Sequence, residues 1–203
     1  MIGICPRCGN YDWDKEVSGV QARCPKCGET WKFQKRPLFI LTGCSGMGKT
    51  TTGIEIMKQQ QEIIVLDVDM FHSIMPHESQ EDYFQQVEQV ESLSKNILQS
   101  GQSVLWTMAG NLDKLNRVYN RRFIGDIYCL ALVCEEAELR RRMTEGRGIT
   151  DAGWIQSSVE YNAYFQTHDQ LADMPFEVLD TTGKSVAQVA EFVIGWVKEK
   201  LNR

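Results

Sequence analysis

The chain has 203 residues, a hydrophobic fraction of 42% and a formal net charge of −5 at pH 7. This length suits one ordinary domain with a small additional module, and the acidic balance gives no general attraction to nucleic acid or to anionic membranes. No apolar run approaches the roughly 20 residues that span a bilayer, and the N-terminus lacks the charged and apolar regions of a signal peptide. We therefore expect a cytoplasmic protein without a membrane anchor.

Four of the seven cysteines form two C-x-x-C pairs near the N-terminus. Cys5 and Cys8 make the first pair, and Cys24 and Cys27 make the second, a spacing typical of four-thiolate zinc sites. In a reducing compartment such pairs indicate a metal rather than disulfides. Because so small a module buries little apolar surface, the metal is expected to supply its stability. We predict a zinc ribbon over residues 1–36, with iron in the same geometry as the alternative.

Three short strands are expected in this ribbon, at residues 11–13, 20–23 and 30–33. The ribbon carries seven lysines and arginines against four acids, and its aromatic residues are Tyr11, Trp13, Trp31 and Phe33. Positive charge with aromatic rings favours binding of single-stranded nucleic acid by stacking. We favour the other interpretation, in which these rings form the small core of the ribbon itself.

The segment from Gly43 to Thr50 has the pattern G-x-x-x-x-G-K-[ST] of a phosphate-binding loop, or Walker A motif. The apolar run 37–42 before it predicts a buried strand, and residues 51–58 after it have the spacing of a helix. Backbone N–H groups and the positive end of the helix dipole bind phosphate in such a setting. We expect Lys49 to reach the β- and γ-phosphates and the Thr50 hydroxyl to bind Mg²⁺. The predicted nucleotide contacts in this loop are Gly43, Ser45, Gly46, Met47, Gly48, Lys49, Thr50 and Thr51.

Beyond the loop, the hydrophobic pattern alternates between strands and helices. Further strands are predicted at residues 63–66, 104–108, 127–134 and 176–179. Helices are predicted at residues 80–98, around 112–118, at 139–143, at 152–168 and after Ser185, where Gln188 completes a capping box. The alternation predicts a five-stranded parallel sheet covered by helices on both faces. Ligands of such sheets bind at the carboxyl ends of the strands.

Two aspartates follow the second strand of this sheet. Asp67 and Asp69 can both face the phosphate loop if the chain leaves the strand at this point. Asp69 is then placed to accept the proton of an acceptor hydroxyl, and Asp67 to support Mg²⁺ through a water molecule. The third strand ends in Trp106-Thr107-Met108 without an acid, which favours Asp67 for the metal. The alternative is that one or both aspartates only end the strand.

An arginine-rich helix and a loop with two glycines follow the fourth strand. Arg147 lies between Gly146 and Gly148 in the segment 144–150, which suits a lid that closes over phosphates. An arginine at the base of this lid can stack on the donor base. The candidates are three consecutive arginines, of which at least one is expected to face solvent: Arg140, Arg141 and Arg142.

From Pro37 to the C-terminus, the chain resembles the small P-loop kinases of the shikimate kinase, gluconate kinase and chloramphenicol phosphotransferase group, close to the nucleoside monophosphate kinases. The matching segments are the phosphate loop, Asp67-x-Asp69, residues 139–147 and residues 179–185. The resemblance implies a P-loop NTPase fold with strand order 2-3-1-4-5. It also implies that Arg140 packs on adenine, Arg147 touches phosphate and Asp69 holds the acceptor hydroxyl. Residues 109–111 replace the glycine triplet of shikimate kinases, and the ribbon is not part of the usual design of this group.

We therefore predict a kinase domain over residues 37–203 that uses ATP and Mg²⁺. It would transfer the γ-phosphoryl group to a small-molecule acceptor, such as a nucleoside or nucleotide, with Lys49, Asp69 and Arg147 as catalytic residues. One alternative is a polynucleotide 5′-kinase whose ribbon guides nucleic acid to the same site. Another is a non-catalytic regulatory protein that binds nucleotides.

Overall fold

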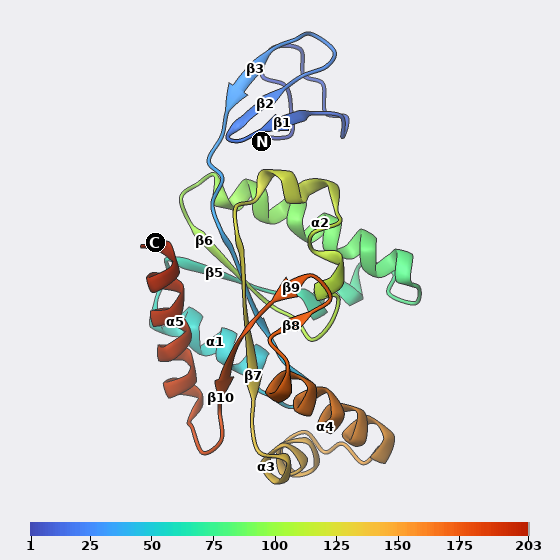
Figure 1. Cartoon of the computed structure of the whole chain (residues 1–203), viewed down its shortest axis with the longest axis vertical. Coiled ribbons are helices and arrows are strands. Elements are labelled where there is room, and N and C mark those ends of the chain that lie inside the picture. The colour runs from blue at the N-terminus through green and yellow to red at the C-terminus, as the bar shows by residue number, and fades with distance from the viewer. Residues whose placement is uncertain (203) are drawn as a thin grey trace.

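Five parallel strands form the central sheet of the structure, a computed structural model that describes residues 1–202 (Figure 1). The strands are β4 (Leu38–Thr42), β5 (Ile63–Asp67), β6 (Ser103–Thr107), β7 (Ile127–Val133) and β10 (Glu177–Asp180). Their order across the sheet is β5-β6-β4-β7-β10, and every neighbouring pair is parallel. Numbered along the P-loop segment, this is the predicted order 2-3-1-4-5. β4 and β6 are buried along their whole length because strands flank them on both sides and helices cover them.

Helices cover both faces of the sheet, which confirms the three-layer α/β sandwich (Figure 1). The helices are α1 (Lys49–Gln59), α2 (Gln80–Leu98), α3 (Glu136–Arg141), α4 (Ala152–Thr167) and α5 (Val186–Leu201). On one face, Ile56 of α1 and Trp196 of α5 share a cluster with Leu105 of β6. On the other face, Val90 of α2 shares a cluster with Trp106 of β6. None of the helices described between residues 1 and 202 is long and apolar enough to cross a membrane.

Two of the long helices begin at a serine whose hydroxyl accepts a hydrogen bond from the N–H three residues further on. Ser185 does so with Gln188, and the Gln188 side chain bonds back to the Ser185 N–H, which confirms the predicted capping box of α5. Ser79 and Asp82 form the same arrangement at the start of α2. These caps satisfy N–H groups that a helix start leaves without intrahelical partners.

Glu91 of α2 is fully buried, and neither of its carboxylate oxygens is hydrogen-bonded within the described part of the chain. Burial raises the pKa of Glu91 to about 9, and the nearby Glu88 adds to this rise. The folded state therefore binds one proton more than the unfolded state between about pH 4.5 and 9. Stability should fall as the pH rises through this window, by up to about 1.4 kcal/mol per pH unit.

A Glu91→Gln variant should remove this titration, because an amide of similar shape stays neutral at every pH. We expect a higher free energy of unfolding than wild type at pH 8 and a flatter profile between pH 5.5 and 8, measured by urea unfolding. Glu81→Gln is the control, since Glu81 is exposed in the first turn of the same helix. A wild-type stability that rises over this range, unchanged in slope by Glu91→Gln, would contradict the prediction.

Three segments differ from the expected elements. The predicted helix around 112–118 is replaced by two short 3-10 turns, Leu112–Lys114 and Tyr119–Phe123. α3 continues into a π-helical turn, Arg142–Gly146, in which the predicted lid begins. An unpredicted hairpin of β8 (Gln170–Leu171) and β9 (Met174–Pro175) precedes β10, and Ala172 in its turn has a φ of 54°. These pieces are too short to give a clear hydrophobic period.

The N-terminal ribbon is a three-stranded antiparallel sheet of β1 (Glu16–Ser18), β2 (Gln21–Arg23) and β3 (Thr30–Lys32). The second and third strands were expected near these positions, whereas the strand predicted at 11–13 is wrong. Asn10 explains the difference: its Oδ1 accepts a hydrogen bond from the Asp12 N–H at 3.0 Å, and Asp14 N–H bonds to Asp12 O at 2.9 Å. Such local bonds hold the backbone in a turn and compete with strand pairing.

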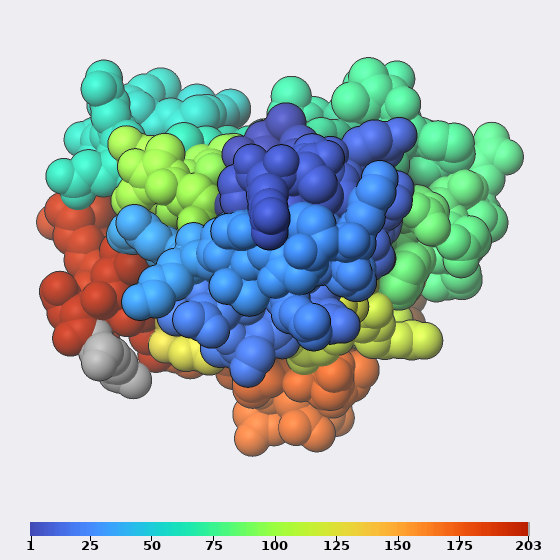
Figure 2. All heavy atoms as spheres, turned by 90° about the horizontal axis from the view of Figure 1, so that it is seen from above, coloured from blue at the N-terminus to red at the C-terminus, as the bar shows by residue number. Residues whose placement is uncertain are grey.

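The ribbon is seated on the P-loop domain at the end of the sheet where β4 begins (Figures 1 and 2). Trp13 stacks on Tyr119, with ring centroids 5.6 Å apart, and Phe33 meets Phe123 edge-on at 5.6 Å. The Lys15 N–H donates to the Tyr119 hydroxyl at 2.9 Å. The phosphate loop follows the opposite end of β4. The ribbon and this loop therefore lie at opposite ends of the sheet.

Candidate functional site

The phosphate loop connects β4 to α1, and its glycines occupy positions that other residues would strain. Gly43, Gly46 and Gly48 have φ angles of 133°, 84° and 89°. A Cβ on Gly43 would lie 2.6 Å from Leu132 O, and one on Gly46 would lie 2.7 Å from Met143 Cγ. The helix cap at Gly48 has no side chain, so N–H groups of the first turn remain available to a ligand. The loop therefore presents backbone donors to an anion.

Lys49, the first residue of α1, is folded back over this loop. Its Nζ donates to Gly43 O and to Cys44 O, both at 2.9 Å, and the residue is only 8% exposed. Burial lowers the pKa of Lys49, while the nearby Asp69 and Asp67 act in the opposite direction. A phosphate oxygen is a stronger partner for an ammonium group than a carbonyl oxygen. Lys49 is thus a buried cation with neutral partners beside an anion site.

A cavity of about 600 Å³ opens on one side of the loop and brings together the three predicted catalytic residues. It is lined by Lys49, Asp69 and Arg147. The predicted loop contacts that also line it are Ser45, Gly46, Gly48, Thr50 and Thr51. A second cavity of about 350 Å³ lies on the other side, between Met47 and the start of α5. Two adjoining spaces thus flank the loop.

The three consecutive arginines do not share one environment. Arg140 pairs with Glu136 at 2.7 Å and donates to Gln156 at 2.9 Å, and it lines neither cavity. Arg141 and Arg142 line both cavities. Arg141 and Arg142, unlike Arg140, therefore lie where an arginine can reach a ligand bound beside the loop.

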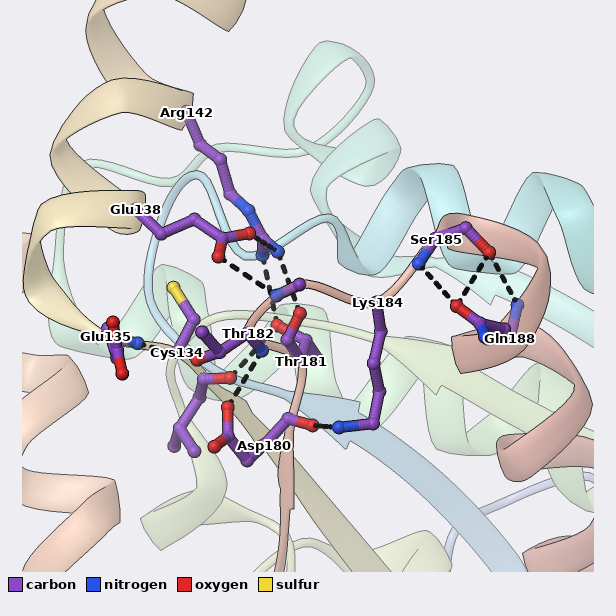
Figure 3. A network of polar contacts seen from close by, with 12 residues as sticks. Cys134, Glu135, Glu138, Arg142, Asp180, Thr181, Thr182, Lys184, Ser185 and Gln188 are labelled. Atoms are coloured by element: carbon purple, nitrogen blue, oxygen red, sulfur yellow. Dashed lines mark hydrogen bonds and ion pairs between the residues drawn. The ribbon is translucent and has the colours of Figure 1, made fainter.

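Arg142 is held by a network that joins α3 to the loop after β10 (Figure 3). It forms an ion pair with Glu138 and donates to the hydroxyl and the carbonyl oxygen of Thr181, both at 3.0 Å. Glu138 also accepts a hydrogen bond from the Gly183 N–H at 3.0 Å. Burial acts to raise the pKa of Glu138, but hydrogen bonds from the Gly183 N–H and Arg142 together lower it. This network fixes the base of the predicted lid.

Trp154, at the start of α4, lines the larger cavity and was not anticipated from the sequence. The guanidinium of Arg147 lies over its ring, with Cζ 5.6 Å from the centroid. Trp154 is 46% exposed, so this cation–π contact is open to solvent. The only sequence signal for this contact was the presence of an aromatic residue seven positions after Arg147. Arg147 therefore rests on Trp154 at the rim of the cavity.

The oxygen-bearing side chains next to the loop fit a hard divalent cation such as Mg²⁺. Asp67 ends β5, is half-buried, and accepts the Asp69 N–H at 3.1 Å on one oxygen. Thr50 lies in the first turn of α1. The chain leaves the strand in a 3-10 turn, Val68–Ser73, which was the condition for Asp69 to reach the cavity. A carboxylate and a hydroxyl beside a phosphate site are ligands that Mg²⁺ accepts.

The four ribbon cysteines fit a tetrahedral metal site at the opposite end of the molecule. Their sulfurs all lie within 4.8 Å of one another, with Cys5 and Cys27 at 3.6 Å and Cys8 and Cys24 at 3.7 Å. Zinc–sulfur bonds of about 2.3 Å would set tetrahedral sulfurs roughly 3.8 Å apart. Burial acts to raise the pKa of Cys24, but hydrogen bonds from the backbone N–H groups of Cys27 and Lys26 lower it to about 6.

Comparisons with known proteins support the fold. No protein-family model matches the chain, and no curated protein matches its sequence. The fold is similar to that of a sugar kinase from Janibacter sp. HTCC2649, with 21% identity, a TM-score of 0.58, and coverage of 81% of this chain and 95% of that one. It is also similar to a gluconokinase from Sinorhizobium meliloti 1021, with 15% identity, a TM-score of 0.55, and coverage of 82% and 94%.

A third similar structure is the Deinococcus radiodurans tunicamycin resistance protein, with 15% identity, a TM-score of 0.54, and coverage of 81% of this chain and 96% of that one. Together with the phosphate loop and the strand order, these similarities identify the fold as that of the P-loop NTPases. Two of these three similar structures are a sugar kinase and a gluconokinase. An N-terminal four-cysteine cluster is added to this fold.

Proposed function

We propose that the protein is an ATP- and Mg²⁺-dependent kinase with a small hydroxyl- or phosphate-bearing acceptor, such as a nucleoside or nucleotide. The observation that carries the proposal is the cavity beside the phosphate loop. Lys49, Asp69 and Arg147 come from three separate elements and line this one space. Phosphoryl transfer requires a phosphate cradle, a group that orients the acceptor, and positive charge over the transferred group. The similarity in fold to a sugar kinase and a gluconokinase also supports a kinase function.

Each of the residues beside the phosphate loop would have a distinct role in phosphoryl transfer. Lys49 and the loop N–H groups bind the β- and γ-phosphates, and Arg141 contacts the nucleotide because it lines both cavities. Asp69 orients the acceptor hydroxyl and takes its proton. Arg147 moves from Trp154 to the phosphates when the lid closes. Thr50 and Asp67 would hold Mg²⁺, which would supply positive charge to the phosphates during transfer.

An Asp69→Asn variant tests the proposal. We expect ATP binding within about twofold of wild type and transfer reduced at least about 100-fold, because the amide cannot take the proton. The measurement is a radiolabelled-ATP transfer screen over nucleosides, sugars, small acids and oligonucleotides, followed by kinetics on the best acceptor. Glu135→Gln is the matched control, an exposed acid outside both cavities. Full transfer by Asp69→Asn would remove this role.

The placement of the ribbon bears on the polynucleotide alternative. The ribbon precedes the start of β4 and the phosphate loop follows its end, so the length of a five-residue strand, about 17 Å, separates them. Trp13 is also engaged with Tyr119. Both observations favour a supporting role for the ribbon. In the same screen, transfer to an oligonucleotide that is lost on changing Trp13 and Trp31 would favour a polynucleotide kinase instead.

The same transfer screen, together with a measurement of ATP binding, tests the non-catalytic alternative. Tight ATP binding by wild type, without transfer to any acceptor in the screen, would favour a nucleotide-binding regulatory protein. We propose zinc rather than iron for the ribbon, and elemental analysis of the purified protein decides between the two metals.

A further inference from the structure

Thr107 is the last residue of β6, and its hydroxyl is buried without a partner. The residue is 1% exposed, and its Oγ1 makes no hydrogen bond to any residue from 1 to 202. Native proteins rarely leave a buried hydroxyl in this state, because losing its bonds to water carries a free-energy penalty. A water or a ligand at this end of the sheet would supply the missing partner of the Thr107 hydroxyl.

The contacts of Thr107 show which face of the sheet its side chain is on. A Cβ built on Gly53 of α1 would lie 3.3 Å from Thr107 Cγ2 and 2.9 Å from Val65 Cγ1. Both side chains therefore point toward α1. Residues two apart in a strand share a face, so Asp67, two residues after Val65, points to this side as well.

The same register brings Thr107 next to the predicted magnesium ligands. Asp67 and Thr107 are opposite partners in the pairing of β5 with β6, and neighbouring strands lie about 4.8 Å apart. Thr50 precedes Gly53 by three residues in α1, so the two lie on the same side of that helix. Three oxygen-bearing side chains thus lie on the α1 side of the sheet, at the start of α1 and at the carboxyl ends of two neighbouring strands.

We propose that the Thr107 hydroxyl is a positioning group for Mg²⁺ that bonds a water of the ion's hydration shell beside Thr50 and Asp67. The inference rests on the proposed function. Mg²⁺ keeps several of its waters in protein sites, and a neutral hydroxyl can hold one of them without adding charge. Thr107 therefore performs with a hydroxyl the task that the missing strand-end acid would perform with a carboxylate.

The test measures Mn²⁺ binding to the full chain in complex with ADP, followed by the electron paramagnetic resonance of free Mn²⁺. Thr107→Val should weaken Mn²⁺ binding about five- to tenfold, as expected for loss of one hydrogen bond. Thr107→Ser keeps the hydroxyl and should bind within about twofold of wild type. ADP affinity without metal should be unchanged in both variants. The melting temperature of metal-free Thr107→Val should not fall, because valine removes an unpartnered polar group.

Thr42→Val is the matched control. Thr42 is also fully buried with an unpartnered Oγ1, but it follows Leu41, which packs toward α1, and so it faces the other side of the sheet. Mn²⁺ binding by Thr107→Val equal to wild type, or an equal loss in Thr42→Val, would overturn the inference while leaving the nucleotide site intact. A wild-type chain that binds no ADP would overturn the proposed function, and this inference with it.

Discussion

A Lys49→Met variant should lose at least about 100-fold in kcat/KM for phosphoryl transfer. Loss of one preorganised donor to developing charge typically reduces rates by about 10²–10³, and Lys49 is the buried cation of the cavity. Methionine keeps the length of the side chain and removes its charge. Steady-state kinetics with ATP and the best acceptor measure the effect.

The same variant should not destabilise the fold, which separates a catalytic from a structural role. Burial lowers the pKa of Lys49, so its charge is held at a cost in the free protein. We expect an equal or higher melting temperature for Lys49→Met. Lys58→Met, an exposed change in the last turn of the same helix, should leave both quantities unchanged. More than a tenth of wild-type activity in Lys49→Met would contradict the assigned role.

Removal of the metal proposed for the ribbon should unfold residues 1–36 while the P-loop domain stays folded. The apolar cluster of the ribbon is small, with Ile2, Ala22 and Phe33 buried together against Phe123. Structural zinc supplies roughly 10–16 kcal/mol in isolated modules of this kind. In a chelated sample or a Cys24→Ser variant, the Cys24 and Gly28 amides, which now bond to Glu29 O and Cys24 O, should exchange at least about 100-fold faster.

Hydrogen exchange followed by mass spectrometry measures this loss, and elemental analysis measures the metal. Cys129→Ala is the control, because Cys129 is a buried core residue of β7 outside the cluster, and one metal per chain should remain. Unchanged protection of the ribbon after complete metal removal would show that its packing on the P-loop domain is sufficient for folding.

The sheet and the phosphate loop could be predicted because their signals are local. The continuous apolar run 127–134 predicts a buried strand without any information about its neighbours. The GxxxxGK[ST] motif predicts the loop together with the strand before it and the helix after it. The order of the strands in the sheet was predicted from the resemblance to the small P-loop kinases. The five strand-end segments were therefore enough to name most residues that line the cavity, Asp69 and Arg147 included.

Details set by helix phase or by distant contacts could not be predicted. Arg140, Arg141 and Arg142 are equivalent in sequence, and their directions follow from where α3 starts and where its π-helical turn begins. Trp154 contacts Arg147 only because the start of α4 lies beside the predicted lid. The ribbon is positioned by Tyr119, which is more than 80 residues away from it along the chain. The strand predicted at 11–13 is absent because the Asn10 side chain bonds to the Asp12 N–H and favours a turn.

The seating of the ribbon has a practical consequence for work on this protein. Phe123 and Tyr119 lie under the ribbon and contact Phe33 and Trp13. A shortened chain that starts at Leu38 would present these aromatic rings to water as a newly uncovered apolar patch, a common cause of self-association. Solubility trials and crystallisation should therefore keep the first 36 residues and supply the metal proposed for their four cysteines, even when only the phosphate-loop chemistry is of interest.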